Sequence, residues 1–323
     1  MKIFLTGGSG FIGSAVVRQL LERGDSVRCL VRQTSSLARI DDLPFERTIG
    51  DVRDGAGLVD AMRGCDAVIH LACLSSWQQI NSADMDAVAV EGTRNVIDAA
   101  LRHGCRRLVY VSSILAIGAS RTPCVMREDS KGDVALGALR YSMAKRRAEE
   151  FCREAAARGL DVVIVNPGEV YGPHDDGMVT AGNLLDFAKS WPVLVCKGGT
   201  AVAHVDDVAS GILAAMDRGR SGERYILASE NLSVRSLAGM TLQILGLRRP
   251  ILNFPTWMVK SLAWLGTNLR MPLPFEPAVI PYATLYWFMD GAKARSELGI
   301  HFRPARETLA STLSWLKTSG RLK

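Results

Sequence analysis

The sequence lacks the features that mark membrane-spanning, disulfide-linked and nucleic-acid-binding proteins. It has no run of about 18 uncharged apolar residues, and the closest candidate, 251–266, is interrupted by Pro255 and Lys260. Its seven cysteines include no CxxC pair, and their odd number argues against a disulfide framework, so reduced thiols and a cytoplasmic location are expected. The net charge of +6 comes without a dense Lys/Arg block or aromatic residues between basic ones, which argues against nucleic-acid binding.

The composition that remains is typical of a globular protein with more than one domain. With 323 residues, 48% of them hydrophobic and 22% charged, the chain suits one large domain and a smaller one. No internal repeat or low-complexity tract is evident. Because strand-like residues begin at position 2, we expect no signal or transit peptide. We also expect no transmembrane span, with contact at a membrane surface as the less favoured alternative.

A glycine-rich stretch near the start organises the rest of the chain. It lies between Lys2–Thr6, an apolar run that predicts a strand, and Ser14–Arg23, whose apolar residues recur at helical spacing. Gly7 permits a tight turn, Gly10 leaves room for a phosphate, and Gly13 lets the helix approach the strand. Backbone N–H groups at such a helix start bind the pyrophosphate of a dinucleotide, so we predict a dinucleotide site here.

The first half of the chain then alternates strands with helices. Several strands are continuous apolar runs, as expected where a parallel sheet is buried on both faces. The further expected strands are Ser26–Arg32, Phe45–Val52, Asp66–Cys73, Arg107–Ser113 and Asp161–Pro167, and the main helices are Ala83–His103 and Tyr141–Arg158. This α/β pattern predicts a doubly wound, Rossmann-type parallel sheet with ligands at the carboxyl ends of its strands.

The alternation stops after Pro167, and the remainder is expected to form a smaller, mostly helical substrate-binding domain. We expect an NAD(P)-binding Rossmann domain at 1–170, rejoined by about 201–228, and a substrate-binding domain at 171–200 and 229–323. Loop-forming residues at 171–183 are expected to cover the cleft. Helices are predicted at 208–216 behind an Asp206 or Asp207 cap, at 251–266, at 292–298 and at 304–317.

Tyr141 and Lys145 carry the main catalytic signal. On a helix, residues four apart share a face, so the lysine ammonium is expected beside the phenol. A nearby positive charge lowers the pKa of a tyrosine from its usual value of about 10, which suits it to general acid–base work near neutral pH. Ser112 and Ser113 end an expected strand at the edge of the cleft, where a substrate carbonyl would lie.

These landmarks occur together in one known family. The motifs are Thr6-Gly-x-x-Gly-x-x-Gly13, Gly50-Asp-Val52, His70-Leu-Ala72, Glu91-Gly-Thr-x-Asn95, Val111-Ser-Ser113, Tyr141-x-x-x-Lys145, Asn166-Pro-Gly-x-Val-Tyr-Gly-Pro173 and His204-Val-Asp-Asp-Val-Ala209. With them the chain resembles the extended short-chain dehydrogenases/reductases of the NAD-dependent epimerase/dehydratase family. Within that family it is most similar to the dihydroflavonol-4-reductase-like and hopanoid-associated branch.

The resemblance implies a role for each matching position. Tyr141 would exchange a proton with the substrate oxygen as hydride moves to or from nicotinamide, and Lys145 would tune Tyr141 and bind the cofactor ribose. Ser113, in preference to Ser112, would hydrogen-bond the substrate oxygen. The implied cofactor-binding positions are Gly7, Gly10, Phe11, Ile12, Gly13, Asp51, Val52, Leu71, Ala72, Cys73, Lys145, Pro167, Gly168 and Val170. The helices at 83–103 and 141–158 correspond to those that pair in family dimers, so a homodimer is expected.

Two departures from the family pattern bear on function. Ala89 stands where relatives often carry an Asn, two residues before Glu91-Gly-Thr93. Thr200 stands where many nucleotide-sugar epimerases carry an Arg, so a substrate diphosphate would lack a natural partner. The second departure argues against a nucleotide sugar as the substrate.

The end of the second expected strand favours NADP over NAD. An NAD enzyme usually places an acidic residue there for the adenosine ribose, but this sequence has Val31-Arg-Gln-Thr-Ser-Ser36 and no carboxylate. Arg32 would pair with a 2′-phosphate, with further donors from Thr34–Ser36. The alternative is a solvated Arg32 that stacks on adenine.

A few other residues are weaker candidates. Trp77, just after the fourth strand, and Met178, in the loop over the cleft, are candidates for substrate contact. The run 285–289 is expected in the core, with the wall of an apolar pocket as the alternative. We expect His70 at a strand end and His204 packed at a strand-to-helix join, and no metal site is predicted.

Together these features predict an NAD(P)-dependent oxidoreductase. They favour an NADPH-linked carbonyl reductase or alcohol dehydrogenase that acts on an apolar ketone or lipid-like small molecule through Ser113, Tyr141 and Lys145. One alternative is a nucleotide-sugar epimerase or dehydratase that retains its NAD. A second is a non-catalytic nucleotide sensor, although a sensor has no need of Tyr141 and Lys145.

Overall fold

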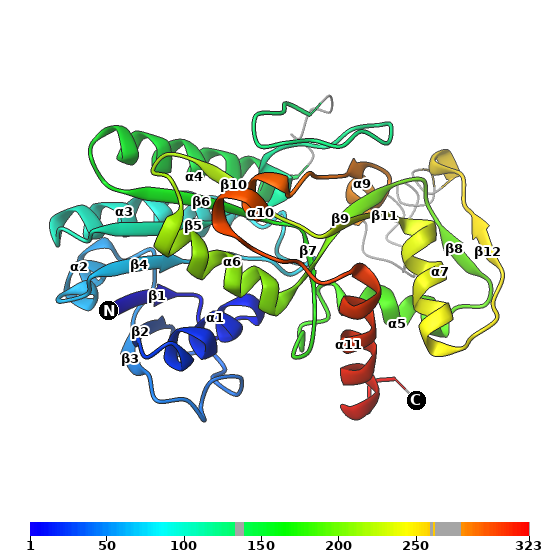
Figure 1. Ribbon diagram of the computed structural model, residues 1–323, viewed down its shortest axis with the longest axis horizontal. Helices are drawn as coiled ribbons and strands as arrows, with labels where there is room; N and C mark the ends of the chain where they lie inside the picture. Colours follow the sequence, from blue (N-terminus) through cyan, green and yellow to red (C-terminus); the bar gives the residue numbers. More distant parts are fainter. Residues whose placement is uncertain (133–138, 259–260, 262–278, 323) are drawn as a thin grey trace.

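The computed structural model describes residues 1–132, 139–258, 261 and 279–322, and a seven-stranded sheet forms its centre (Figure 1). All its neighbouring strands are parallel, in the order β10-β6-β5-β4-β1-β2-β3. The strands are β1 (Lys2–Thr6), β2 (Ser26–Val31), β3 (Glu46–Ile49), β4 (Ala67–His70), β5 (Arg107–Val111), β6 (Val162–Pro167) and β10 (Arg224–Leu227). The strand order reverses between β1 and β4, which leaves a crevice at their carboxyl ends. The predicted doubly wound Rossmann-type sheet is confirmed.

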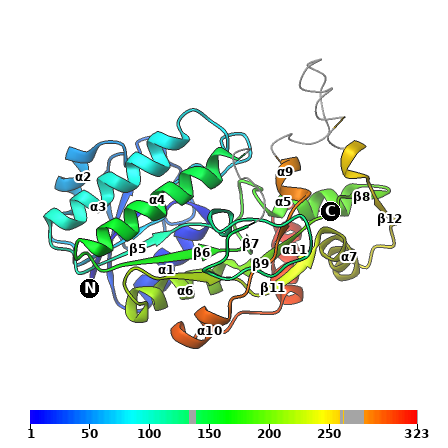
Figure 2. The ribbon, with the colours of Figure 1, turned by 90° about the horizontal axis from the view of Figure 1, so that it is seen from above.

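Helices cover both faces of this sheet, as Figure 2 shows. On one face lie α1 (Phe11–Glu22) and α6 (Val205–Arg218); on the other lie α2 (Gly55–Met62), α3 (Gly92–Arg102) and α4 (Arg140–Ala157). Each face has its own apolar core. Val16, Leu20 and Ile212 are fully buried in the first, and Val96 and Ala148 in the second. The apolar runs of the strands reflect this burial on both faces.

The second part of the fold is built on a four-stranded sheet. The order β11-β9-β13, with β7 beside β9, joins β7 (Glu169–Tyr171), β9 (Gly199–His204), β11 (Glu230–Ser233) and β13 (Tyr286–Trp287). A two-stranded ribbon pairs β8 (Val193–Val195) with β12 (Ile251–Asn253). The helices are α5 (Ala181–Lys189), α7 (Val234–Leu245), α9 (Val279–Ala283), α10 (Ala292–Leu298) and α11 (Ala305–Thr318). In Figure 1, α5, α7, α11 and the ribbon lie at the end of the molecule away from α2 and α3.

Three local predictions differ from the structure. The predicted helix at 83–103 is a π-helical segment, η1 (Asp86–Glu91), that leads into α3. The segment 251–266 was expected to be a helix, and residues 256–258 and 261 are helical, but Ile251–Asn253 forms β12 because it pairs with β8. Residues 259–260 and 262–266 lie outside the described residues. In the part of the chain that the structure describes, no helix is long and apolar enough to cross a membrane.

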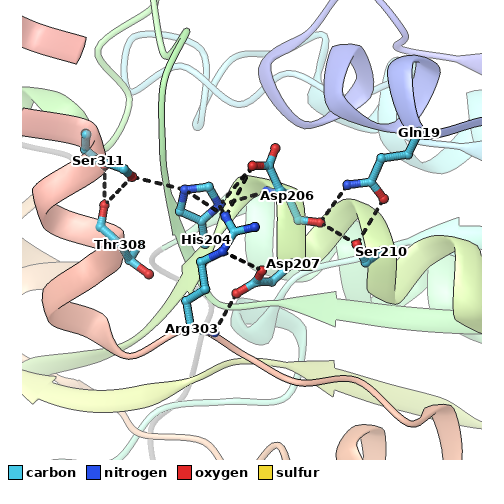
Figure 3. A network of polar contacts seen from close by, with 9 residues as sticks. Gln19, His204, Asp206, Asp207, Ser210, Arg303, Thr308 and Ser311 are labelled. Carbon is cyan, nitrogen blue, oxygen red and sulfur yellow. Dashed lines mark hydrogen bonds and ion pairs between the residues drawn. The ribbon is translucent and has the colours of Figure 1, made fainter. Parts of the chain in front are cut away.

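The third difference concerns the start of α6. The predicted caps were Asp206 or Asp207, but the imidazole of His204 accepts a hydrogen bond from the Asp206 N–H at 3.1 Å and caps the helix. The Nε2 of His204 also lies 3.0 Å from the Ser311 hydroxyl of α11 (Figure 3). Arg303 donates its backbone N–H to Asp207 at 2.7 Å. His204 thus lies at the predicted strand-to-helix join, where this polar network fastens α11 to α6.

Candidate active site

A cavity of about 390 Å³ lies at the carboxyl ends of the central strands. Almost all the residues expected at the cofactor and in catalysis line it: Gly7, Gly10, Phe11, Ile12, Gly13, Arg32, Asp51, Val52, Leu71, Ala72, Cys73, Ser112, Ser113, Tyr141, Lys145, Gly168 and Val170. They come from positions between 7 and 170, so the parallel sheet brings together groups that are far apart in the chain. The candidate substrate residue Trp77 lines the same cavity.

Two of the expected residues lie outside the cavity lining. Pro167 ends β6, where it pairs with Leu227 of β10, and its neighbours Gly168 and Val170 line the cavity instead. Met178 has a positive φ of 50° and packs against the cluster that contains Tyr171 rather than on the cavity. Contact between Met178 and a substrate stays a prediction.

The glycine-rich turn has the close backbone approaches expected of a phosphate site. Gly7 has a φ of +78°, and a Cβ there would lie 2.9 Å from the Ala72 nitrogen. A Cβ on Gly13 would collide with the Gly7 carbonyl oxygen. Gly10 is the N-cap of α1 and offers no side-chain acceptor, so the N–H groups of the first turn remain available to a ligand. The turn fits the pyrophosphate of a dinucleotide.

Tyr141, Lys145 and Ser113 come together in the wall of this cavity. The Lys145 ammonium is buried and donates to the Val111 carbonyl at 2.8 Å. It lies 5.8 Å from the centre of the Tyr141 ring. The Ser113 side chain is near enough to the Tyr141 phenol to lower its pKa, and the Ser113 hydroxyl accepts from the Leu115 N–H at 3.2 Å.

The pKa of Tyr141 differs from the expectation that Lys145 lowers it. Burial raises this pKa above its usual value of 10, the nearby Cys73 adds to the rise, and the Ser113 hydrogen bond opposes it. The Lys145 ammonium, 5.8 Å from the centre of the ring, does not offset this rise. Tyr141 is therefore a protonated phenol at neutral pH, ready to donate a proton to a ligand oxygen.

A buried hydrogen-bond network explains why Ser113, rather than Ser112, is the serine available to a ligand in the cavity. The Ser112 hydroxyl donates to Glu149 at 2.6 Å. Asn166 donates to the same carboxylate at 2.7 Å and to the Ser113 carbonyl at 2.9 Å. Glu149 is fully buried, and Arg224 lies 3.0 Å from its other oxygen. Sequence reasoning missed Glu149, because nothing but its helical register marks it as buried.

The imidazole of His70 has a structural place beneath the glycine-rich turn. Its Nδ1 lies 2.6 Å from the Thr6 hydroxyl and its Nε2 lies 3.0 Å from the Thr93 hydroxyl. Because Thr93 donates its proton to the Ala89 carbonyl at 2.7 Å, it accepts from the Nε2–H, and Nδ1 accepts from Thr6. Burial and the charge of Lys145 lower the His70 pKa to about 3, so the imidazole is neutral. This chain of hydrogen bonds ties β1 to the π-helical turn at Ala89.

The adenosine end of the cavity is basic. Arg32 follows β2 and is exposed, and its backbone N–H donates to the Ser35 hydroxyl at 3.2 Å. Among the described residues the Arg32 guanidinium forms no ion pair. Asp51 pairs with Arg53 at 2.8 Å, and this hydrogen bond lowers the Asp51 pKa. Arg53 was not identified from the sequence, although its place two residues after Asp51 permits this pairing.

The other end of the cavity is lined mainly by apolar and aromatic side chains, together with the carboxylate of Glu169. Trp77 donates its indole N–H to the Val179 carbonyl at 3.0 Å and lies 5.5 Å from the ring of Tyr282. Thr200 lies behind the cavity wall, where its hydroxyl is 2.9 Å from the Tyr282 hydroxyl. Trp287, in the run expected to be core, is fully buried and stacks on Tyr282. The further apolar lining residues are Leu74, Ile80, Val88 and Leu115.

Comparison with known proteins identifies the family. The model of the NAD dependent epimerase/dehydratase family matches residues 3–228. The chain is 34% identical to a putative dihydroflavonol 4-reductase of Synechocystis, over 99% of this chain and 96% of that one. It is 31% identical to sterol demethylase protein B of Methylococcus capsulatus, over 99% of both. The dTDP-glucose 4,6-dehydratase DesIV of Streptomyces venezuelae, solved with NAD and TYD bound, superposes with a TM-score of 0.80 at 25% identity, over 98% of this chain and 97% of that one. The chain therefore belongs to the NAD-dependent epimerase/dehydratase family and is an enzyme of the extended short-chain dehydrogenase/reductase type.

Proposed function

We propose that this enzyme is an NADPH-linked carbonyl reductase or alcohol dehydrogenase that acts on an apolar ketone or lipid-like small molecule. The observation that carries the proposal is that Ser113, Tyr141 and buried Lys145 lie together in the wall of one cavity that is lined mainly by apolar residues. Two relatives support it by name, the dihydroflavonol reductase-like protein and sterol demethylase protein B.

In this proposal the chain's own residues orient the carbonyl and supply its proton. Bound NADPH supplies the hydride. Ser113 and Tyr141 donate hydrogen bonds to the substrate oxygen, and Tyr141 transfers its proton as negative charge develops there. The raised pKa of Tyr141 suits this direction, because the phenol holds its proton until an oxyanion forms beside it. Lys145 contributes positive charge behind the phenol and a donor for the cofactor ribose.

The preference for NADP is part of the same proposal. Arg32 is exposed at the end of β2, it forms no ion pair among the described residues, and it lines the cavity with Ser35. A guanidinium there can bind a 2′-phosphate in a bidentate manner. The carboxylate of Asp51, which would suit a ribose diol, is already paired with Arg53.

The organisation of the protein is proposed along with its chemistry. We assign 1–170 and about 201–228 to the Rossmann domain and 171–200 with 229–323 to the substrate-binding domain. A homodimer through the outer faces of α3 and α4 is supported by their adjacent places on one side of the sheet (Figure 2). Met143 on α4 is 41% exposed and would be covered in such a dimer. A cytoplasmic location is consistent with its seven free cysteines.

One experiment separates this proposal from its alternatives. The purified protein is extracted for bound dinucleotide and then titrated with NADPH and NADH, and NADPH oxidation is followed with a panel of apolar ketones. An empty protein that prefers NADPH and reduces a ketone supports the proposal. Tightly retained NAD would favour a sugar epimerase or dehydratase such as the structural neighbour DesIV. Dinucleotide binding with no turnover of any substrate class would favour a nucleotide sensor.

A further inference from the structure

A buried carboxylate stands at the far end of the cavity. Glu169 lies on β7, is 8% exposed and lines the cavity together with Tyr282. One oxygen accepts hydrogen bonds from the Tyr171 hydroxyl at 2.6 Å and from the Asn183 amide at 2.9 Å. The other accepts from the Tyr282 hydroxyl at 2.7 Å. The side chain is therefore held in one orientation from three sides.

Glu169 has no cationic partner among the residues that the structure describes. Within the described ranges, no Lys, Arg or His forms an ion pair with it. Glu149 is the informative contrast, because it is buried to a similar degree and pairs with both Arg153 and Arg224. The donors around Glu169 are neutral dipoles, which stabilise a carboxylate without neutralising its field. In a partly closed, apolar cavity that field acts strongly on any ligand charge.

The hydroxyl groups around the carboxylate remain donors. Burial, followed by the charge of Glu169, raises the pKa of Tyr171 well above its usual value, and the same two causes raise the pKa of Tyr282. Thr200 then donates to the Tyr282 oxygen, since the Tyr282 proton points to Glu169. The Thr200 hydroxyl is therefore used in a hydrogen bond behind the cavity wall. Its side chain is neutral and cannot form an ion pair with an anionic ligand.

Glu169 and the catalytic Tyr141 line the same cavity. Tyr282, which donates to Glu169, packs with Tyr141 against one apolar cluster. Tyr282 also lies 5.5 Å from Trp77, and both line the cavity. A ketone whose carbonyl contacts Tyr141 would therefore share this cavity with the Glu169 carboxylate.

We propose that Glu169 selects the substrate by charge: the enzyme takes neutral ketones, prefers those with a hydrogen-bond donor at the distal end, and rejects those with a carboxylate or phosphate there. A hydroxyl can use the lone pair that the three protein donors leave free on the carboxylate. An anion at the same place meets a like charge without an intervening cation. This inference rests on the proposed reductase function, because it assumes that a carbonyl sits at Tyr141.

Binding in the cofactor complex tests the proposal without turnover. Three ten-carbon 2-ketones are compared by calorimetry with the NADP⁺-saturated protein: one ends in a hydroxyl, one in a methyl ester and one in a carboxylate. We expect the hydroxyl compound to bind most tightly and the carboxylate at least about tenfold more weakly than its ester, since like charges brought together cost several kcal/mol. If the wild-type protein binds the carboxylate as well as the ester, the proposal is wrong.

A charge-removing variant assigns the effect to Glu169. Glu169→Gln keeps the size of the side chain, and we expect the difference between ester and carboxylate to shrink to about threefold or less. Glu154→Gln, on the exposed face of α4, is the matched control and should retain the wild-type difference. Unchanged discrimination in a folded Glu169→Gln protein would also refute the role of Glu169.

The outcome is separable from that of the proposed function. If none of the three ketones binds, the enzyme selects no neutral ketone and the charge-selection proposal is wrong. This conclusion does not depend on which cofactor the enzyme prefers. If the hydroxyl compound binds as expected but is not reduced, the charge selection stands and the reductase function falls. Thermal unfolding of each variant, with and without NADP⁺, establishes that the protein compared is folded.

Discussion

The exchange of Arg32 for alanine tests the cofactor site more sharply than any other single change. Arg32 is exposed at the carboxyl end of β2, lines the cavity and forms no ion pair within the described part of the chain. Its removal therefore breaks no ion pair among the described residues, although the charge of Arg32 does act on Asp51. The comparison of NADPH with NADH separates the effect on the 2′-phosphate from any effect through Asp51.

The expected magnitude follows from the exposure of Arg32. A guanidinium and a phosphate about 4 Å apart attract by about 1 kcal/mol in water and about 4 kcal/mol near a protein surface of lower dielectric. Because Arg32 is exposed, solvent screens the pair and the lower half of that range applies. We expect Arg32→Ala to weaken NADPH binding by about 5- to 70-fold, which corresponds to about 1–2.5 kcal/mol. NADH, which has no 2′-phosphate, should change by about twofold or less.

Fluorescence titration of both reduced cofactors measures the two effects in one assay. Arg47→Ala, an exposed arginine on the neighbouring strand β3, is the matched control and should leave both affinities unchanged. The NADPH preference of the wild type should also decrease as salt is added, because ions screen an exposed pair. Equal loss of NADPH and NADH affinity in Arg32→Ala, or a wild type that prefers NADH, would refute the reasoning.

Three further substitutions test the proton donor in the cavity wall and the buried hydrogen bonds of His70. Tyr141→Phe removes the proton donor but keeps the ring, so kcat for ketone reduction should fall at least about 100-fold with NADPH affinity retained, and an active variant would contradict the assigned role. Burial and the charge of Lys145 lower the His70 pKa to about 3. Between pH 6.5 and pH 3 the unfolded chain therefore binds a proton at His70 that the folded protein does not bind. The free energy of unfolding consequently decreases as the pH falls through this range. Going from pH 7 to 5 should remove up to about 2 kcal/mol in urea titrations, and His70→Asn should lack this part of the slope. Thr93→Val removes the hydroxyl between His70 and the Ala89 carbonyl and should cost about 1–3 kcal/mol; an unchanged unfolding midpoint would exclude that contribution.

The features that could be predicted from the sequence are those with a local signature. The glycine spacing, the apolar strands and the pair Tyr141–Lys145 each depend on a few adjacent residues, and the parallel sheet then brings their positions to one edge. The helices at 292–298 and 304–317 were found for the same reason, since Gly299 and Pro304 mark their ends. These predictions needed no knowledge of tertiary contacts.

The features that were missed depend on distant partners. Ile251–Asn253 is a strand only because β8 lies beside it. His204 caps α6 because Ser311 and Arg303, more than 95 residues further along, hold its ring in place. The raised pKa of Tyr141 likewise comes from the burial that the assembled fold imposes, and the helical spacing of Lys145 alone suggested the opposite shift.

The Ala89 position shows why a departure from a family motif needs its structural setting. Ala89 is 1% exposed within the π-helical turn η1, so the turn forms here without a side-chain amide. The Thr93 hydroxyl donates to the Ala89 carbonyl at 2.7 Å and so adds a side-chain hydrogen bond to this π-helical turn. Thr93 is in turn held by His70, which also bonds Thr6 at the end of β1. The kink beside the catalytic wall is therefore fixed by buried threonine and histidine side chains.

The cavity also differs in charge between its two ends. The basic end carries Arg32 and the available N–H groups of the α1 start, whereas the far end carries the carboxylate of Glu169, which has no cationic partner among the described residues. In the proposed function, a dinucleotide would bring its anionic phosphates to the first end and would meet repulsion at the second. A neutral ketone would have no such preference and would occupy the part of the cavity near Tyr141 and Glu169. The same arrangement would orient the cofactor and disfavour a substrate with its own diphosphate.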